Sequence, residues 1–190
     1  ANLAGGTHHA FADHGEGFCV LNDVAVAIRL LQQEGMIKRA VVIDVDVHQG
    51  NGTAAIFAKD PTTFTFSMHG ARNYPFKKEN SSLDIELPDG ASDALYLDEL
   101  NRHLEIFLAK ASADILFYLA GVDTVAGDRY GRLSLSRDGL RDRDRAVLLA
   151  AQKQNVPVTL LMSGGYAQTA EATADLHAIV HREAAKIFHR

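Results

Sequence analysis

The sequence is poor in the features that mark several classes of protein. Cys19 is the single cysteine among 190 residues, which excludes an internal disulfide framework and a zinc site built from several cysteines. With 4 prolines and 15 glycines, the chain is neither collagenous nor of low complexity. No apolar run approaches the roughly 20 residues that span a bilayer. The formal net charge of -5 gives no electrostatic footprint for a nucleic acid or an anionic membrane, so we expect no direct nucleic-acid partner.

The composition that remains is that of a folded domain. Hydrophobic residues make up 47% of the chain and charged residues 23%, and the length is sufficient for a sizeable core. No repeat, linker or break in composition divides the chain, so we expect residues 1–190 to form a single domain. The lone cysteine, with no signal-like or membrane-spanning segment, leads us to expect an intracellular, cytoplasmic protein. The sequence carries no signal for an oligomeric state.

Short apolar segments alternate with longer amphipathic ones. The β-branched and apolar runs predict buried strands over 40–47, 62–68, 115–120 and 157–162. Apolar residues at helical spacing predict helices over 22–35 (with Asn22 as N-cap), 53–58, 92–110, 136–155 and 169–189, and the polar segment 69–82 indicates a long loop. The alternation predicts an α/β fold with a doubly wound, mainly parallel sheet, whose ligands bind beyond the carboxyl ends of the strands.

Polar side chains gather where these predicted strands end. Asp44, Asp46 and His48 are spaced by two, and side chains two apart on a strand share a face. Adjacent carboxylates at the end of a buried strand repel each other and are costly to desolvate, which a bound cation would relieve. Asp123 follows the third predicted strand. An Asp/His/Asp set with an open position predicts a catalytic metal site.

Two further groups fit the same chemistry. The first loop carries the adjacent His8 and His9, which suit proton transfer, and Tyr166 follows the last predicted strand, where its hydroxyl suits an oxyanion. A plainer interpretation remains, in which Asp44 and Asp46 are helix caps and His48 is a loop residue.

Other polar residues favour structural roles. His177 and His181 are four apart, but no glutamate follows His177 as in the metalloprotease motif, so we expect a solvated face of the last helix. Arg143 lies among arginines that alternate with acids, which predicts a salt-bridged helix face. Cys19 is expected to be a small core residue.

Five motifs, in this order, resemble the zinc-dependent histone deacetylase superfamily. They are GGTHHA at 5–10, GFCVLND at 17–23, IDVDVHQGNG at 43–52, AGVD at 120–123 and SGGY at 163–166. Residues 48–52, 127–129 and 163–166 resemble the class IV (histone deacetylase 11-like) branch and its bacterial relatives. The resemblance implies the arginase/deacetylase fold, a three-layer α/β/α sandwich. It also implies that the segment preceding the histidine pair in relatives is absent from these 190 residues.

The resemblance assigns roles in the catalytic centre residue by residue. It makes Asp46, His48 and Asp123 the ligands of Zn²⁺, although such an oxygen-rich site also accepts Fe²⁺, Co²⁺ or Mn²⁺. The remaining catalytic positions are the histidine pair His8 and His9, Asp44 as partner of His8, Asn51 as partner of His9, and Tyr166 as the group that polarises the acyl carbonyl. Because a carboxylate favours imidazolium and an amide does not, we expect His8 to be more basic than His9, which leaves His9 as the general base.

The resemblance also implies a substrate channel and a second cation site. The channel residues are Phe18 and Tyr74 as aromatic walls, with Gly17 and Gly164. The second site, for a monovalent cation such as K⁺, is made largely of backbone oxygens of Asp44, Asp46, His48, Ser67 and Met68.

The implied activity is hydrolysis of acyl groups, acetyl or longer fatty acyl, from the ε-amine of lysine in a protein or peptide. An acetylpolyamine or another small acylated amine is an alternative substrate. A catalytically silent metal-binding remnant is an alternative of a different class. Gln49, Asn51 and Ser163 depart from the residues that many relatives carry, without removing a ligand.

Overall fold

The computed structural model describes residues 1–188, which fold into five strands and five helices. The strands are β1 (Ala40–Asp44), β2 (Thr63–Gly70), β3 (Leu83–Leu87), β4 (Ile115–Leu119) and β5 (Val158–Leu161). The helices are α1 (Asp23–Gln33), α2 (Asn51–Phe57), α3 (Asp93–Ala111), α4 (Arg137–Lys153) and α5 (Ala170–Phe188).

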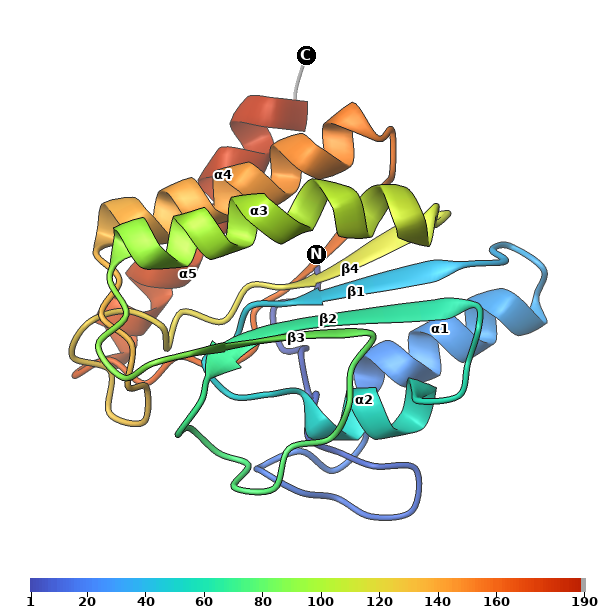
Figure 1. The fold of residues 1–190 in the computed structure, drawn as a ribbon, viewed down its shortest axis with the longest axis horizontal. Coiled ribbons are helices and arrows are strands. Elements are labelled where there is room, and N and C mark those ends of the chain that lie inside the picture. The colour runs from blue at the N-terminus through green and yellow to red at the C-terminus, as the bar shows by residue number, and fades with distance from the viewer. Residues whose placement is uncertain (189–190) are drawn as a thin grey trace.

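The elements form three layers around one parallel sheet. The strand order is β3-β2-β1-β4-β5, and every neighbouring pair is parallel. Helices α1 and α2 cover one face, while α3, α4 and α5 cover the other (Figure 1). The predicted α/β class, the mainly parallel sheet and the three-layer sandwich are therefore confirmed.

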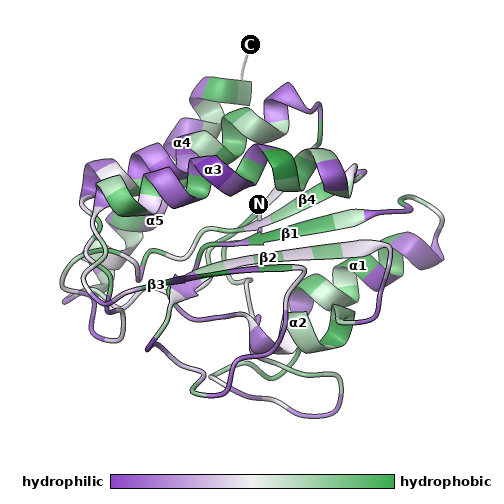
Figure 2. Ribbon diagram, in the orientation of Figure 1, coloured by the Kyte–Doolittle hydropathy of each residue, from purple (hydrophilic) through white to green (hydrophobic). Residues whose placement is uncertain are grey.

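The central strand β1 shows why the strands are continuous apolar runs. All its residues are buried, because helices cover both faces of the sheet. Side chains alternate between the faces: Val41 and Ile43 join the core under α3 and α4, and Val42 joins the core under α1 and α2. In Figure 2, β1 and β4 are accordingly mostly green, whereas β2 is paler and the edge strand β3 shows hydrophilic purple.

Most element boundaries differ from expectation by one or two residues, and two differences are larger. β1 ends at Asp44, not at residue 47, because the next residues turn out of the sheet. β3 lies just beyond the predicted loop 69–82 and was not expected. It is a five-residue edge strand, paired in parallel with β2, in which apolar residues alternate with Asp84 and Glu86. This alternation is the pattern of a half-buried strand, and the search for continuous apolar runs missed it. The predicted N-cap Asn22 is confirmed, since its side chain accepts from the N–H of Ala25 at 2.9 Å.

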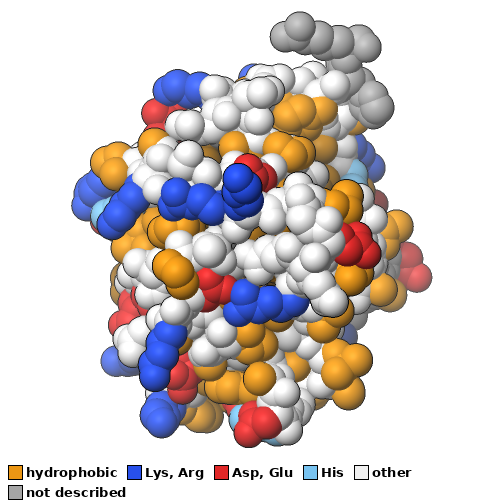
Figure 3. Space-filling view, turned by 90° about the vertical axis from the view of Figure 1, so that its right-hand side faces the viewer, with side chains coloured by type: hydrophobic (Ala, Val, Ile, Leu, Met, Phe, Trp, Pro, Cys, Tyr) orange, Lys and Arg blue, Asp and Glu red, His pale blue; other side chains and the backbone are white. Residues whose placement is uncertain are grey.

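The surface carries charges of both signs. On the face drawn in Figure 3, basic and acidic side chains are interspersed among apolar and neutral ones. Within residues 1–188, no helix has both the length and the apolar character needed to cross a membrane.

Arg143 on α4 is fully buried, so the expectation that it lies on a salt-bridged surface is wrong. Its guanidinium donates to the carbonyl oxygens of Val45 at 3.3 Å and Gly121 at 2.7 Å, and it pairs with Asp144 at 2.8 Å. Arg and Asp alternate along residues 141–145, so this pattern does not distinguish the buried arginine from its exposed neighbours. The hydrogen bonds from Arg143 to the carbonyl oxygens of Val45 and Gly121 join the loops that follow β1 and β4.

Replacing Arg143 should destabilise the fold. We expect Arg143→Met to lower the free energy of unfolding by about 3 kcal/mol, because a buried carboxylate and two carbonyls lose their partner. Urea denaturation measures this loss. Arg141→Met, on the same helix but with an exposed side chain paired to Asp138 and Asp142, is the control and should cost about 0.5 kcal/mol or less. Equal losses from the two substitutions would contradict the assignment.

Candidate metal and catalytic site

The candidate residues meet at the carboxyl edge of the sheet. Asp44 is the last residue of β1, Asp46 and His48 lie in the loop after it, and Asp123 follows β4. The strand-face explanation for their spacing is wrong, because the loop residues are not in a strand. Carboxylates organise the loop instead: Asp44 Oδ1 accepts from the N–H of Asp46 at 3.1 Å, and Asp46 Oδ1 accepts from the N–H of His48 at 2.9 Å.

Asp46, His48 and Asp123 form a compact cluster of metal-binding atoms. Each contributes one ligand atom, and these atoms all lie within 4.8 Å of one another. His48 Nδ1 is 3.0 Å from Asp46 Oδ1 and 3.2 Å from Asp123 Oδ2. Asp46 is 1% exposed and Asp123 is fully buried. The structure thus brings together the three residues that the sequence singles out as ligands.

Neighbouring backbone orients the two carboxylates. Asp46 Oδ2 accepts from Ser163 Oγ and from the N–H of Gly164, both at 2.7 Å, and Asp123 Oδ1 accepts from the N–H of Val47 at 2.9 Å. A Cβ on Gly164 would overlap Asp123 Oδ2 and Asp46 Oδ2, so this position requires glycine. Asp123 Oδ2 accepts no hydrogen bond of good geometry among residues 1–188, although His48 Nδ1 lies 3.2 Å away.

The electrostatics of the cluster fit a bound cation. Burial and the charge of Asp46 raise the pKa of Asp123 to about 7. Burial lowers the pKa of His48, but its contacts with Asp123 and Asp46 outweigh this and raise the pKa to about 10. A divalent cation would supply the positive charge that the two carboxylates attract. One imidazole and two carboxylates are a typical donor set for a catalytic zinc or a related divalent metal.

The two adjacent histidines have different partners and different basicity. His8 Nδ1 is 2.6 Å from Asp44 Oδ2, and His9 Nδ1 is 2.7 Å from Asn51 Oδ1. Burial lowers the pKa of His8, but the charges of Asp44 and Asp46 raise it to about 9 overall. Burial and the neighbouring His8 lower the pKa of His9 to about 3. His8 is therefore the more basic of the pair, in the order expected from their partners.

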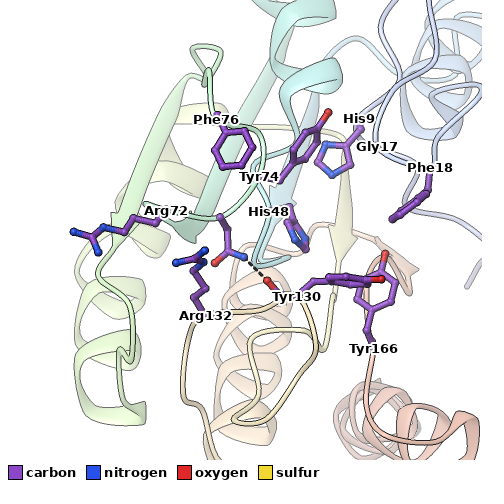
Figure 4. A pocket seen from close by; sticks show the side chains of 11 residues that line it. His9, Gly17, Phe18, His48, Arg72, Tyr74, Phe76, Tyr130, Arg132 and Tyr166 are labelled. Atoms are coloured by element: carbon purple, nitrogen blue, oxygen red, sulfur yellow. Dashed lines mark hydrogen bonds between the residues drawn. The ribbon is translucent and has the colours of Figure 1, made fainter.

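A cavity of about 500 Å³ opens above the cluster (Figure 4). His9, His48 and Tyr166 line it together with three residues of the predicted channel, Phe18, Tyr74 and Gly17. The fourth, Gly164, lies on a smaller cavity of about 180 Å³ that shares His9, His48 and Tyr166 with the first and reaches Asp46.

Several lining residues were not found by sequence reasoning. They are Arg72, Asn73, Phe76, Tyr130 and Arg132. They come from two irregular segments, 72–76 and 130–132. Neither segment has a helical or strand periodicity that would indicate which side chains line the cavity.

Asp128 was quoted in the 127–129 motif without a role. Its Oδ2 accepts from the N–H of Tyr166 at 2.7 Å, and its Oδ1 accepts from the N–H groups of Tyr130 and Gly131, both at 2.9 Å. The Tyr130 and Tyr166 rings meet edge to face, with centroids 4.8 Å apart. Asp128 therefore fixes the backbone from which Tyr166 projects.

The proposed monovalent-cation residues lie at the end of β1, in the loop after it, and within the neighbouring strand β2. Asp44 and Ser67 are paired in register, and the next residue, Met68, has its side chain in the core. The Met68 sulfur is thus packed in the core.

His177 is buried, at 4% exposure, so the expectation that it lies on a solvated face is wrong. It packs near Gly165, and its Nδ1 has no hydrogen-bond partner among residues 1–188. Burial and the charge of Arg143 lower the pKa of His177 to about 4, so it is neutral. Cys19, expected in the core, is only partly buried.

Comparison with known proteins identifies relatives. The histone deacetylase domain family matches residues 1–181. The chain is 48% identical over 187 residues to an uncharacterised protein of the cyanobacterium Picosynechococcus sp., an alignment that covers 98% of this chain and 62% of the relative. It is 34% identical over 168 residues to histone deacetylase 2 of Arabidopsis thaliana, covering 87% and 43%. The chain therefore spans less than two thirds of the length of these curated relatives.

Solved structures show the same fold. Acetylpolyamine aminohydrolase from Burkholderia pseudomallei superposes with a TM-score of 0.79 at 24% identity, covering 95% of this chain and 54% of that one. The HDA15 HD domain superposes with a TM-score of 0.77 at 24% identity, covering 99% and 55%. These likenesses confirm the arginase/deacetylase fold.

Zinc should stabilise the native protein through the Asp46–His48–Asp123 cluster. At a free Zn²⁺ concentration about 100-fold above its dissociation constant, binding adds about 2.7 kcal/mol to stability, and Tm rises. Asp123→Asn should lose most of this rise, whereas His103→Asn, at a partly exposed position on α3, should retain it. Thermal unfolding with and without Zn²⁺ measures the effect, and an equal rise in Asp123→Asn would contradict this ligand assignment.

The basicity of His8 should depend on Asp44. In the metal-free protein, Asp44→Asn should lower the His8 pKa from about 9 to 6.5 or below, because burial is then opposed mainly by Asp46. Since the native pKa lies above the ordinary 6.5, the His8 proton stabilises the wild type fully below pH 6.5, and this contribution is lost as pH rises through 9. An NMR titration of the imidazole measures the pKa, and a His8 pKa that stays near 9 in the variant would refute the pairing.

Proposed function

Since this chain belongs to the histone deacetylase family, we propose that it is a zinc-dependent hydrolase that removes acyl groups from the ε-amine of lysine. The observation that carries this proposal is the Asp46–His48–Asp123 cluster beneath a cavity that His9 and Tyr166 line. Its buried Asp123 Oδ2 lies 3.2 Å from His48 Nδ1 but accepts no hydrogen bond among residues 1–188. The substrate is an acyl-lysine in a protein or peptide, and the acyl group is acetyl or a longer fatty acyl chain.

The metal, when bound to Asp46, His48 and Asp123, would polarise the acyl carbonyl and lower the pKa of a bound water. His9 is the general base: its low pKa leaves it neutral at pH 7, with Nδ1 facing Asn51 and Nε2 available to accept a proton. His8, kept protonated by Asp44, contributes positive charge beside the developing oxyanion.

Tyr166 is the proposed oxyanion donor. Burial and the charges of Asp46 and Asp123 raise its pKa, so its hydroxyl stays protonated and can donate a hydrogen bond. The bond from its N–H to Asp128 fixes its position at the cavity. The walls formed by Phe18, Tyr74 and Phe76 suit the aliphatic stem of a lysine and its acyl chain.

We also propose a family branch, a location, a domain organisation and a second cation for this chain. The 48–52, 127–129 and 163–166 motifs support membership of the class IV branch, and likeness to a cyanobacterial protein supports a bacterial-type relative. The lone Cys19 supports a cytoplasmic location. We propose further that residues 1–190 form one catalytic domain. A K⁺ is proposed to bind near Asp44 and Ser67, which are paired in register.

The cavity lining favours acyl-lysine over an acetylpolyamine. Arg72 and Arg132 line it, and no acidic side chain among the described residues does, although Asp89 lies 3.9 Å and 3.4 Å from the two guanidinium groups. The free amines of a polyamine are cationic and would be repelled by these arginines. A silent remnant is disfavoured because the proposed ligands, both histidines and the tyrosine are all present.

Hydrolysis should be tested with acetyl-lysine and myristoyl-lysine peptides and an acetylated diamine. We expect the zinc-loaded protein to hydrolyse a lysine peptide, releasing the carboxylic acid of its acyl group, with a higher kcat/KM than the acetylated diamine. A chelator should abolish this hydrolysis. His9→Ala should lower kcat by about 10²- to 10⁴-fold and Tyr166→Phe by about 10²- to 10³-fold. His8→Ala should cost less than His9→Ala, and His103→Ala should leave turnover unchanged.

Three outcomes would count against parts of the proposal. Absence of acid release from every substrate, in a protein shown to contain zinc, would favour the remnant. A higher kcat/KM for the acetylated diamine would favour the polyamine alternative. Near wild-type turnover in His9→Ala, with loss in His8→Ala, would reverse the base assignment.

A further inference from the structure

Asn51 connects His9 to a carboxylate that has no role in the function proposed above. Asn51 Oδ1 faces His9 Nδ1 at 2.7 Å, and Asn51 Nδ2 donates to Glu16 Oε1 at 3.0 Å. The same Glu16 oxygen accepts from the hydroxyl of Tyr74. A continuous chain of hydrogen bonds therefore runs from the proposed base through an amide to Glu16.

Glu16 determines which way the Asn51 amide faces. An amide presents an acceptor on one side and a donor on the other, whereas an ionised carboxylate can only accept. With Glu16 on one side, Asn51 must turn Nδ2 toward the carboxylate and Oδ1 toward His9. His9 Nδ1 then carries the proton, and Nε2 keeps the lone pair that a general base needs.

His8 has no such requirement. Its partner Asp44 is itself a carboxylate, which accepts from Nδ1 without a second residue to orient it. Without Glu16, the Asn51 amide could rotate by half a turn and present its Nδ2 donor to His9 Nδ1. The chain thus has a specific need for an acceptor behind Asn51, and Glu16 lies there.

We propose that Glu16 is a positioning residue that sets the tautomer of His9 through Asn51. The tautomer claim stands on the contacts alone, whereas its catalytic consequence rests on the proposed function. Hydrogen bonds from Tyr74 and Asn51 lower the pKa of Glu16, so it stays ionised and acceptor-only at neutral pH.

The local backbone places Glu16 for this role. The N–H of Glu16 donates to the carbonyl of Cys19 at 2.9 Å, and the N–H of Cys19 returns a bond to the carbonyl of Glu16 at 2.8 Å. The tight turn closed by these bonds contains two residues with positive φ, Gly17 at 52° and Phe18 at 67°. A Cβ on Gly17 would overlap the His9 ring, so the turn that carries Glu16 also packs on the base.

The His9 tautomer should respond to Glu16 in a way that a merely structural residue would not produce. In ¹⁵N NMR spectra of the zinc-loaded protein, with His9 identified by its loss in His9→Ala, we expect a single Nδ1–H tautomer for the wild type. Glu16→Ala should give a mixture of tautomers, and Glu16→Gln an intermediate result, because a glutamine can also donate. An unchanged tautomer in Glu16→Ala would overturn the proposal.

Replacing Asn51 by aspartate should remove the dependence of the His9 tautomer on Glu16. Asn51→Asp supplies an acceptor-only partner, so His9 should keep the Nδ1–H tautomer with or without Glu16. Asp13→Asn, at an exposed position in the same loop, is the matched control and should leave the tautomer unchanged. Tyr74→Phe should also leave it unchanged, because the Asn51–Glu16 contact remains; a mixture there would assign the effect to Tyr74 and overturn the role of Asn51.

Kinetics provide a second, separable test. Glu16→Ala should lower kcat by about 5-fold, the scale of one hydrogen bond, with little change in KM. In the Asn51→Asp background the same substitution should cause no loss, because an aspartate there accepts from His9 Nδ1 without Glu16. Equal losses in both backgrounds would overturn the proposal. If the wild type hydrolyses no acyl-lysine, the proposed function fails, but the tautomer measurement still decides the role of Glu16.

Discussion

Three carboxylates, Asp44, Asp46 and Asp123, are buried at one edge of an apolar parallel sheet, and the surrounding site is arranged to compensate their charge. His8 faces Asp44, while Ser163 and backbone N–H groups bind the other two. These partners come from the first loop, the loop after β1 and the loop after β5. The compensation therefore exists only when the strands are assembled. Of these three carboxylates, Asp123 has an oxygen, Oδ2, that accepts no hydrogen bond among residues 1–188, and the metal is proposed to bind there.

Much of the fold, and the ligand set itself, could be inferred from the sequence because both depend on local patterns. Apolar runs located four of the strands, and polar residues directly after them located Asp46, His48 and Asp123. The geometry behind the spacing was different: Asp46 and His48 come together through side-chain contacts to the backbone of a turn, not through strand alternation. Local composition indicates which residues are near the end of a strand, but not how the chain leaves it.

The residues that sequence reasoning missed depend on contacts distant in the chain. Arg143 is surrounded by charges of both signs, and only the packing of α4 against the sheet decides that it is buried. His177 is likewise buried because α5 packs on α4 and the loop after β5. Glu16 lies in a polar loop where an acid is unremarkable, and its contact with Asn51 spans 35 residues of sequence. No periodicity or motif in one sequence encodes such pairings.

The carboxylate of Asp128 contacts the backbone of two different regions, the cavity wall at Tyr130 and the strand-end loop at Tyr166. The width of the cavity and the position of the proposed oxyanion donor are consequently coupled through one side chain. Mutations that reshape the 128–132 loop to admit a bulkier acyl chain would displace Tyr166 as well. Evolution or engineering of substrate range on this scaffold is therefore freer at Phe76, whose side chain is exposed, than in the 128–132 loop.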